Sequence, residues 1–147
     1  MKQLAFRVYG RPVPQGSKNI YKGRPVEQAK ALAPWRQAVS YSALQASKLD
    51  SEWESFAEPV RLDMTFLFER PRAHFGTGRN SGILKESAPA RYKGTTPDLS
   101  KLIRAVEDGI TDVGVWTDDN LVAAVYAEKV YAALGEPPGV SVRISAL

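Results

Sequence analysis

A strict two-residue alternation runs from Pro59 to Phe68, and it constrains the fold more than any other feature of the chain. Successive side chains of a β-strand point to opposite faces, so this pattern predicts a strand with one apolar face. The residues of that face are Val60, Leu62, Met64, Phe66 and Phe68. The residues between them are polar except for Leu67. We therefore expect a β-sheet with a buried face.

The remaining periodic segments supply the other elements of the predicted fold. Residues 3–9 and 140–145 alternate, and residues 121–131 are apolar and β-branched, so all three are predicted strands. A helix is expected from Pro34, at its first position, through about Lys48. A second helix is expected over about 97–112, where apolar residues recur at helical spacing. This order predicts an α+β fold, a mixed β-sheet packed with two main helices.

Length and the lack of cysteine narrow the class of protein. A chain of 147 residues is expected to form a single domain over residues 1–147 with a sizeable core. The absence of Cys excludes thiol catalysis, Cys-based zinc sites, iron–sulfur clusters and disulfide scaffolds. No apolar run approaches the roughly 20 residues of a membrane span. We expect an unexported protein of the cytosol that does not interact with a membrane.

Positive charge is concentrated in two segments without a lasting period, which we predict to be long loops over about 11–33 and 70–97. Residues 1–30 hold seven Lys and Arg against one acid, and residues 70–97 hold six against one. The net charge of the whole chain is only +4, so the rest of it is acidic. Clustered basic residues favour a polyanionic partner, most simply nucleic acid. Solvated basic loops without a ligand are the alternative.

Three aspartates lie at the two ends of the second predicted helix. Asp98 opens the helix, and Asp118 and Asp119 follow its end. If the strand after Asp119 returns alongside the helix, these carboxylates approach one another, and their repulsion favours a bound cation. Mg²⁺, or Mn²⁺ in its place, suits such hard oxygen ligands together with phosphate oxygens and water. Beside basic loops, this predicts phosphodiester hydrolysis, although helix-end and turn roles explain each aspartate equally well.

The segment that carries these aspartates matches a known signature. It reads PDLSKLIRAVEDGITDVGVWTDDN over residues 97–120. It closely resembles the signature of the RusA family of Holliday-junction endonucleases, in which Asp-Leu-Asp opens a helix with a basic residue and Trp-x-Asp-Asp follows it. The stretch HFGTGRN at residues 74–80 and the stretch GRPVPQGSK at residues 10–18 also resemble phage-type members. The resemblance therefore covers most of the chain.

The resemblance implies a homodimer that binds four-way or related branched DNA and cuts it twice, in recombination, repair or phage replication. Carried over by position, Asp98 and Asp119 match metal-binding catalytic carboxylates, and Asp118 is a weaker candidate for the same site. Arg104 stands where the family has an essential lysine. A guanidinium can hold phosphate in a bidentate way but does not give up a proton, so Arg104 is expected to clamp phosphate.

Ser100 is the clearest departure, because it occupies the position of a third catalytic aspartate. Its loss should weaken metal binding unless Ser100 itself contributes or another acid substitutes for it. Glu107 and Asp108 are the candidate substitutes, about two turns further along the helix. The alternative is a catalytically degenerate protein that only binds branched DNA. A general nuclease or RNA-acting domain is a third possibility.

Basic residues of the two loops and of the helix are the candidate DNA contacts. They are Lys18, Arg24, Arg72, Arg79, Lys85, Arg91, Lys93 and Lys101. Phe75 and Tyr92 lie within the second basic loop and could stack on exposed bases or fix the loop to the body. His74 is the only histidine, which excludes a multi-histidine metal site. Trp35 and Trp116 are expected in the core.

Overall fold

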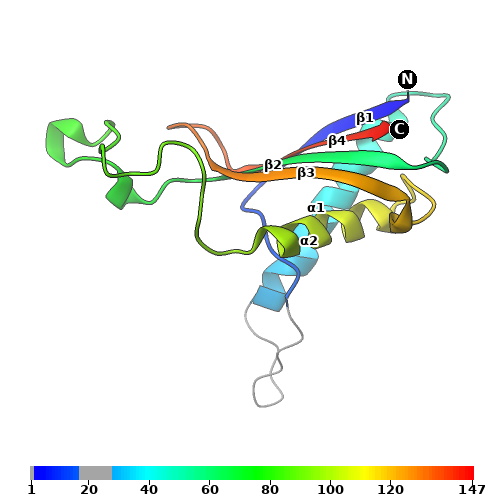
Figure 1. Ribbon diagram of the computed structural model, residues 1–147, viewed down its shortest axis with the longest axis horizontal. Coiled ribbons are helices and arrows are strands. Elements are labelled where there is room, and N and C mark those ends of the chain that lie inside the picture. Colours follow the sequence, from blue (N-terminus) through cyan, green and yellow to red (C-terminus); the bar gives the residue numbers. More distant parts are fainter. Residues whose placement is uncertain (1, 17–27) are drawn as a thin grey trace, which may run out of the picture.

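The computed structural model describes residues 2–16 and 28–147. Its main elements, in chain order, are β1 (Gln3–Tyr9), α1 (Gln28–Lys48), β2 (Val60–Phe68), α2 (Leu99–Asp112), β3 (Val122–Tyr131) and β4 (Gly139–Ala146) (Figure 1). Short 3-10 turns form η1 (Arg72–His74), η2 (Gly78–Asn80) and η3 (Asp119–Leu121). The predicted α+β class, with one mixed sheet and two main helices, is confirmed for these residues. Within them, no helix is both long and apolar enough to cross a bilayer.

The four strands form one sheet in the order β1-β4-β2-β3. β4 pairs antiparallel with both β1 and β2, whereas β2 and β3 run parallel. A parallel pair needs a crossover connection, and here that crossover contains α2. The topology therefore lays α2 along the same face of the sheet to which β2 presents five of its six buried apolar residues.

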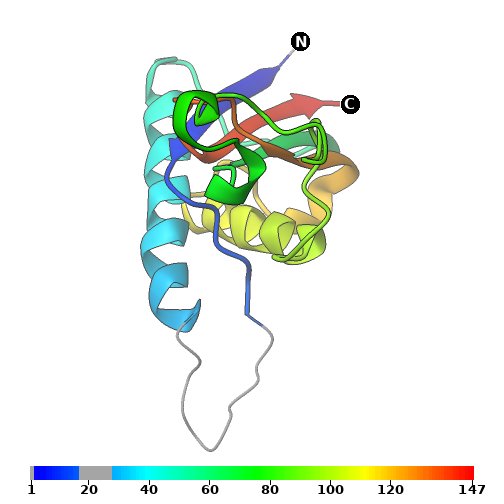
Figure 2. The ribbon, with the colours of Figure 1, turned by 90° about the vertical axis from the view of Figure 1, so that its left-hand side faces the viewer.

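Both helices cover that one face of the sheet, with α2 between α1 and the β3 edge (Figures 1 and 2). Their apolar residues join those of the strands in one core, represented by Val39, Leu62, Phe66, Leu102 and Ile110. The Arg36 guanidinium on α1 also forms two hydrogen bonds, of 2.7 and 2.9 Å, with the carboxylate of Asp112 at the end of α2. α1 thus fixes the far end of the helix that carries the candidate site.

α1 begins six residues before its predicted start, so the loop predicted over residues 11–33 is wrong at its C-terminal end. Residues 28–33 read QAKALA, which are all good helix formers. Pro34 lies inside the helix and not at its first position. It removes one backbone hydrogen bond, but the helix continues on both sides because its packing outweighs that loss. Residues 17–27 of the predicted loop lie outside the described residues.

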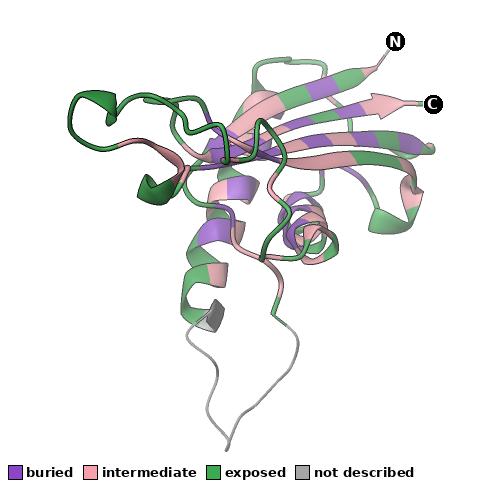
Figure 3. Ribbon diagram, turned by 60° about the vertical axis from the view of Figure 1, so that its left-hand side comes forward, coloured by how far each residue is buried: buried purple, intermediate pink, exposed green. Residues whose placement is uncertain are grey.

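The connection between β2 and α2 leaves the body of the molecule as an arm, residues 70–92 (Figures 1 and 3). A bridge between Phe75 and Leu84 closes the arm on itself. At its end Tyr92 bridges Val130, so the chain joins the β3 edge of the sheet before α2 begins. Most of the arm is exposed (Figure 3). The predicted long basic connection is therefore present, and it is ordered by local turns and by contact with β3.

The two helices make their closest approach at Gly109, and we expect Gly109→Ala to lower the free energy of unfolding by about 1–2 kcal/mol. An added Cβ would lie 2.9 Å from Val39 Cγ1 and 3.1 Å from the carbonyl oxygen of Arg36. Alanine gains about 1 kcal/mol in helix propensity over glycine. Overpacking outweighs this gain, because neither a β-branched side chain nor backbone moves aside easily.

Urea denaturation measures the effect of Gly109→Ala. Gly94→Ala is the matched control, because its Cβ would meet no atom within 4 Å. We expect the control to change stability by less than about 0.5 kcal/mol. A Gly109→Ala protein as stable as the native chain would contradict the close packing of α1 on α2.

Candidate active site

Asp98 is the N-cap residue of α2, in agreement with its predicted place at the start of this helix. Its backbone is extended (φ −66°, ψ 133°), and its carbonyl oxygen accepts a hydrogen bond from Leu102 N at 3.1 Å. The carboxylate makes no capping hydrogen bond, is 60% exposed and lies 3.6 Å from Lys101 Nζ. A negative charge is favourable here because the helix N-terminus is the positive end of its dipole. The carboxylate remains accessible to a ligand.

Asp118 and Asp119 lie side by side in sequence but have different surroundings. Asp118 is the N-cap of η3, and its Oδ1 accepts a hydrogen bond from Asn120 N at 2.9 Å. Asp119 is the first residue of η3 and is exposed. No ion pair to Asp119 is formed by the described residues. Asp118 thus has a structural task that Asp119 lacks.

Glu107 is the acidic residue on α2 whose pKa is affected by the charge of Asp119. Burial raises the pKa of the Glu107 carboxyl, the charges of Asp119 and Asp108 raise it further, and Arg104 lowers it. Asp108 lies 4.0 Å from the Arg104 guanidinium, one turn away on the same helix. The flank of α2 that faces η3 therefore concentrates carboxylates that repel one another and favour a cation.

The structure divides the predicted acids between two places along α2. Asp98 lies at the start of the helix, with Lys101, whereas the charge of Asp119 acts on Glu107, nine residues further on. Nine residues correspond to a rise of about 13.5 Å. Residues 2–16 and 28–147 contain no group of three or more His, Asp or Glu side chains that could hold a metal ion. The structure therefore pairs Asp119 with Glu107 and leaves Asp98 with basic neighbours.

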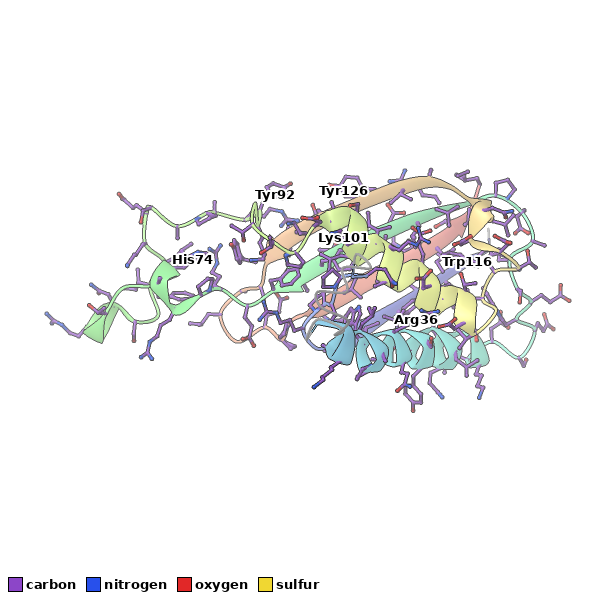
Figure 4. All side chains as sticks on the ribbon, turned by 90° about the horizontal axis from the view of Figure 1, so that it is seen from below. Arg36, His74, Tyr92, Lys101, Trp116 and Tyr126 are labelled. Atoms are coloured by element: carbon purple, nitrogen blue, oxygen red, sulfur yellow. The ribbon has the colours of Figure 1, made fainter. Side chains whose placement is uncertain are left out.

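Ser100, Arg104 and Glu107 share one side of α2, because residues four and seven apart align on a helix. Ser100 is exposed in the first turn, and the Arg104 side chain is 70% exposed. Arg104 reaches Asp108 only at 4.0 Å, so its guanidinium remains available to an anion. Figure 4 shows Lys101 near the start of this helix and Trp116 beyond its other end.

Basic side chains surround the start of α2. Lys93, Lys101 and Lys129 converge there, and the charge of Arg11 is close enough to affect Lys93. Burial lowers the pKa of Lys93 and so does Arg11. Lys129 was not predicted as a site residue. The available signal was a lysine within a mostly apolar strand, at the position that pairs with buried Phe66.

The other predicted DNA contacts lie away from α2 or outside the described residues. Exposed positions on the arm are occupied by Arg72, Arg79 and Lys85. The Arg91 guanidinium forms an ion pair with Glu128 on β3 at 2.7 Å, which fixes the end of the arm to the sheet. Lys18 and Arg24 lie outside the described residues. The arm therefore supplies a basic surface beyond the end of the sheet.

Aromatic residues divide between the core and the arm. Trp35 and Trp116 are buried, which confirms their predicted place in the core. The His74 ring packs edge-to-face on Tyr131 with centroids 4.9 Å apart, so it attaches the arm to the end of β3. Tyr92 is exposed beside Tyr126 at the β3 edge (Figure 4). The Arg91 guanidinium lies over the Tyr92 ring, 5.5 Å from its centroid.

Carboxylates along one helix and its following turn, bordered by basic side chains and a basic arm, define a candidate site for phosphodiester chemistry on a polyanion. The chain belongs to the RusA endodeoxyribonuclease family, because the family model Endodeoxyribonuclease RusA matches residues 10–145. This is a family of endodeoxyribonucleases that resolve Holliday junctions, and its members generally depend on a divalent metal ion. A search of curated proteins finds no match to the chain.

Proposed function

We propose that this protein is a divalent-metal-dependent endodeoxyribonuclease that cuts four-way junctions or related branched DNA by phosphodiester hydrolysis. Family membership over residues 10–145 supports the reaction class. Family membership and the acids of α2 and η3 support the metal dependence: the charge of Asp119 acts on half-buried Glu107 and, with burial, raises the pKa of that carboxyl. Carboxylates that repel one another at an exposed surface are stabilised by a cation.

The donor chemistry of these acids fits Mg²⁺ or Mn²⁺. Mg²⁺ takes one or two protein carboxylates and completes its shell with water and phosphate oxygens, so a two-carboxylate donor set suffices. Asp119 and Glu107 would hold the ion. Asp98, the other acid of the family signature, lies at the start of α2, about 13.5 Å along the helix from Glu107, and would act there and not as a ligand of this ion. Glu107 thereby substitutes for the acid that Ser100 replaces. When bound, such an ion polarises a phosphoryl oxygen and lowers the pKa of a bound water.

The other residues of the site bind and orient the DNA. Arg104 has an exposed guanidinium on the same side of α2 as Glu107, so it is placed to hold a phosphate and to stabilise negative charge that develops there. Lys93 and Lys101 offer further phosphate contacts at the start of the helix. The arm, with Arg72, Arg79 and Lys85, extends the basic surface along a second duplex arm of the junction.

Resolution of a junction requires two incisions, one in each of two strands. The described residues of one chain hold one such set of acids, so we propose that two copies form a homodimer with two active sites. Recombination, repair and phage replication are the processes that produce suitable branched DNA. A reducing cytosol, where this cysteine-free chain needs no disulfide, is the compartment that we propose for it.

Glu107→Gln tests the substitute acid through stability. In EDTA we expect this variant to be more stable than the native chain, because it removes a half-buried charge repelled by Asp119 and Asp108. In Mg²⁺ the native chain should gain melting temperature, and the variant should gain less. Thermal melts in EDTA and in Mg²⁺ measure both effects. An equal Mg²⁺ shift in the two proteins would remove Glu107 from the metal site.

Cleavage of a synthetic four-way junction tests the proposed function directly. We expect paired nicks in Mg²⁺ or Mn²⁺, none in EDTA, and junction binding in both. Binding in all conditions without any nick would favour the degenerate DNA-binding protein. Cleavage of linear duplex or of RNA at the junction rate would favour a general nuclease or an RNA-acting domain.

A further inference from the structure

A single lysine of β3 holds the short segment that leads into α2. This strap, residues 93–97, connects the arm to the helix. Lys129 Nζ donates hydrogen bonds to the carbonyl oxygens of Thr95, at 2.6 Å, and Pro97, at 2.8 Å. The backbone carbonyl of Lys129 accepts a third hydrogen bond, from Lys93 N at 3.0 Å. One residue therefore fastens the strap at both of its ends.

The position of Lys129 within the sheet makes these hydrogen bonds costly to lose. It pairs with Phe66 on β2, and Ala127, two residues earlier on the same face of β3, packs against the core. The Lys129 side chain is half-buried, so its ammonium group is partly shielded from water and is stabilised by hydrogen-bond partners. Two carbonyl oxygens of the strap satisfy two of its three N–H groups. Strap and lysine are therefore held together.

Asp98 depends on this arrangement more than a usual N-cap does. It follows Pro97 directly, so its backbone begins at the peptide unit whose oxygen Lys129 binds. Its carboxylate makes no capping hydrogen bond that would fix it on the helix end. Burial and the nearby Lys93 lower the pKa of Lys129, and the charge of Asp98 raises it, which indicates that ammonium and carboxylate are neighbours.

We propose that Lys129 is a positioning residue for junction cleavage, which fixes the strap and thereby holds Asp98 in its reactive place at the start of α2. The proposal rests on the proposed function, in which Asp98 is a catalytic carboxylate. Lys129 acts through backbone carbonyls and through Asp98, and not by contact with the DNA. Groups that support catalytic carboxylates in this way typically affect activity by 10- to 100-fold.

Lys129→Met and Lys129→Arg test the proposal, with Lys48→Met as the control. Lys48 is an exposed lysine in the last turn of α1, so its loss removes the same charge elsewhere. For Lys129→Met we expect the single-turnover cleavage rate at saturating junction to fall about 10- to 100-fold. The junction Kd should change by less than about threefold, the size of a single screened charge effect. Arginine can donate to both carbonyls, so Lys129→Arg should recover part of the rate.

Amide hydrogen exchange without metal or DNA supplies a readout that is independent of activity. In Lys129→Met the amides of Thr95, Thr96 and Asp98 should exchange faster than in the native chain, while those of β1 and β4 remain protected. In Lys129→Arg they should lie between the two. If Lys129→Met is poorly folded, Lys129→Arg alone tests the proposal: faster amide exchange of the strap together with an unchanged cleavage rate overturns it.

Two further results would overturn the positioning role. In the first, Lys129→Met cleaves the junction at the native rate while Asp98→Asn is inactive. This result overturns the positioning role but leaves the proposed function intact. The other is weaker junction binding by Lys129→Met with an unchanged saturating rate, which makes Lys129 a phosphate contact. Native cleavage by Asp98→Asn would instead overturn the proposed role of Asp98, and the positioning role with it.

Discussion

Asp119→Asn is expected to lower metal-dependent junction cleavage by about 10³-fold, which corresponds to about 4 kcal/mol of lost transition-state stabilisation. The substitution keeps the shape of the side chain and removes the charge that acts on Glu107. Asp119 makes no ion pair with the described residues, so its loss should not destabilise the fold. Single-turnover cleavage in Mg²⁺, with junction binding measured in EDTA, separates the lost rate from lost affinity.

Two neighbouring substitutions make this result specific. Asp118→Asn keeps an oxygen that can accept the hydrogen bond from Asn120 N, so we expect a much smaller loss, within about tenfold. Asp50→Asn removes one negative charge in the turn after α1 and should leave cleavage unchanged. Nicking by Asp119→Asn at the native rate would exclude Asp119 from the active site, as would an equal loss in all three variants.

Trp116→Ala should have the largest effect on stability, about 3–5 kcal/mol. Trp116 is among the largest fully buried side chains, and its indole N–H donates a 2.8 Å hydrogen bond to Thr111 Oγ1. Phe56 bridges it from the segment before β2. Because the chain turns from Trp116 directly into Asp118 and Asp119, the cavity would also loosen η3, and cleavage should fall with stability.

Urea denaturation measures how much Trp116→Ala lowers the free energy of unfolding. Two further variants serve as references. Trp116→Phe keeps an aromatic ring but loses the hydrogen bond to Thr111, so we expect about 1–2 kcal/mol. Trp53→Ala removes a tryptophan that is only half-buried, and its cost should be smaller than that of Trp116→Ala. If Trp116→Ala lost less than about 1 kcal/mol, Trp116 would not be the anchor of this corner of the core.

Local periodicity was sufficient to predict most elements of the fold. The alternation of β2 and the helical spacing of α2 are both visible in the sequence because each element buries one face. The predicted start of α1 at Pro34 is wrong, although a proline is typical of the first position of a helix. Pro34 and the residues before it belong to one helix, and no local rule weighs the packing of that helix against a single lost hydrogen bond.

The candidate site was predicted less completely than the fold. The signature from Asp98 to Asp119 indicated the acids and Arg104, because residue type and spacing along one segment are visible in a sequence. The neighbourhood of Glu107 and Asp119 was not visible, since it depends on how η3 folds back on α2. Lys129 was missed for the same reason, because its partners Thr95 and Pro97 lie more than 30 residues away.

By itself, the sequence determined the strands, the amphipathic helix, the two basic segments and the family to which the chain belongs, because each of these depends on residues that are near one another in the chain. Only the tertiary structure decided which carboxylate Asp119 faces, which lysine holds the start of α2 and how closely Gly109 lets the helices approach. These contacts arise when the parallel pairing of β2 and β3 forces the chain to cross over the sheet, and that crossover brings distant residues within a few ångströms.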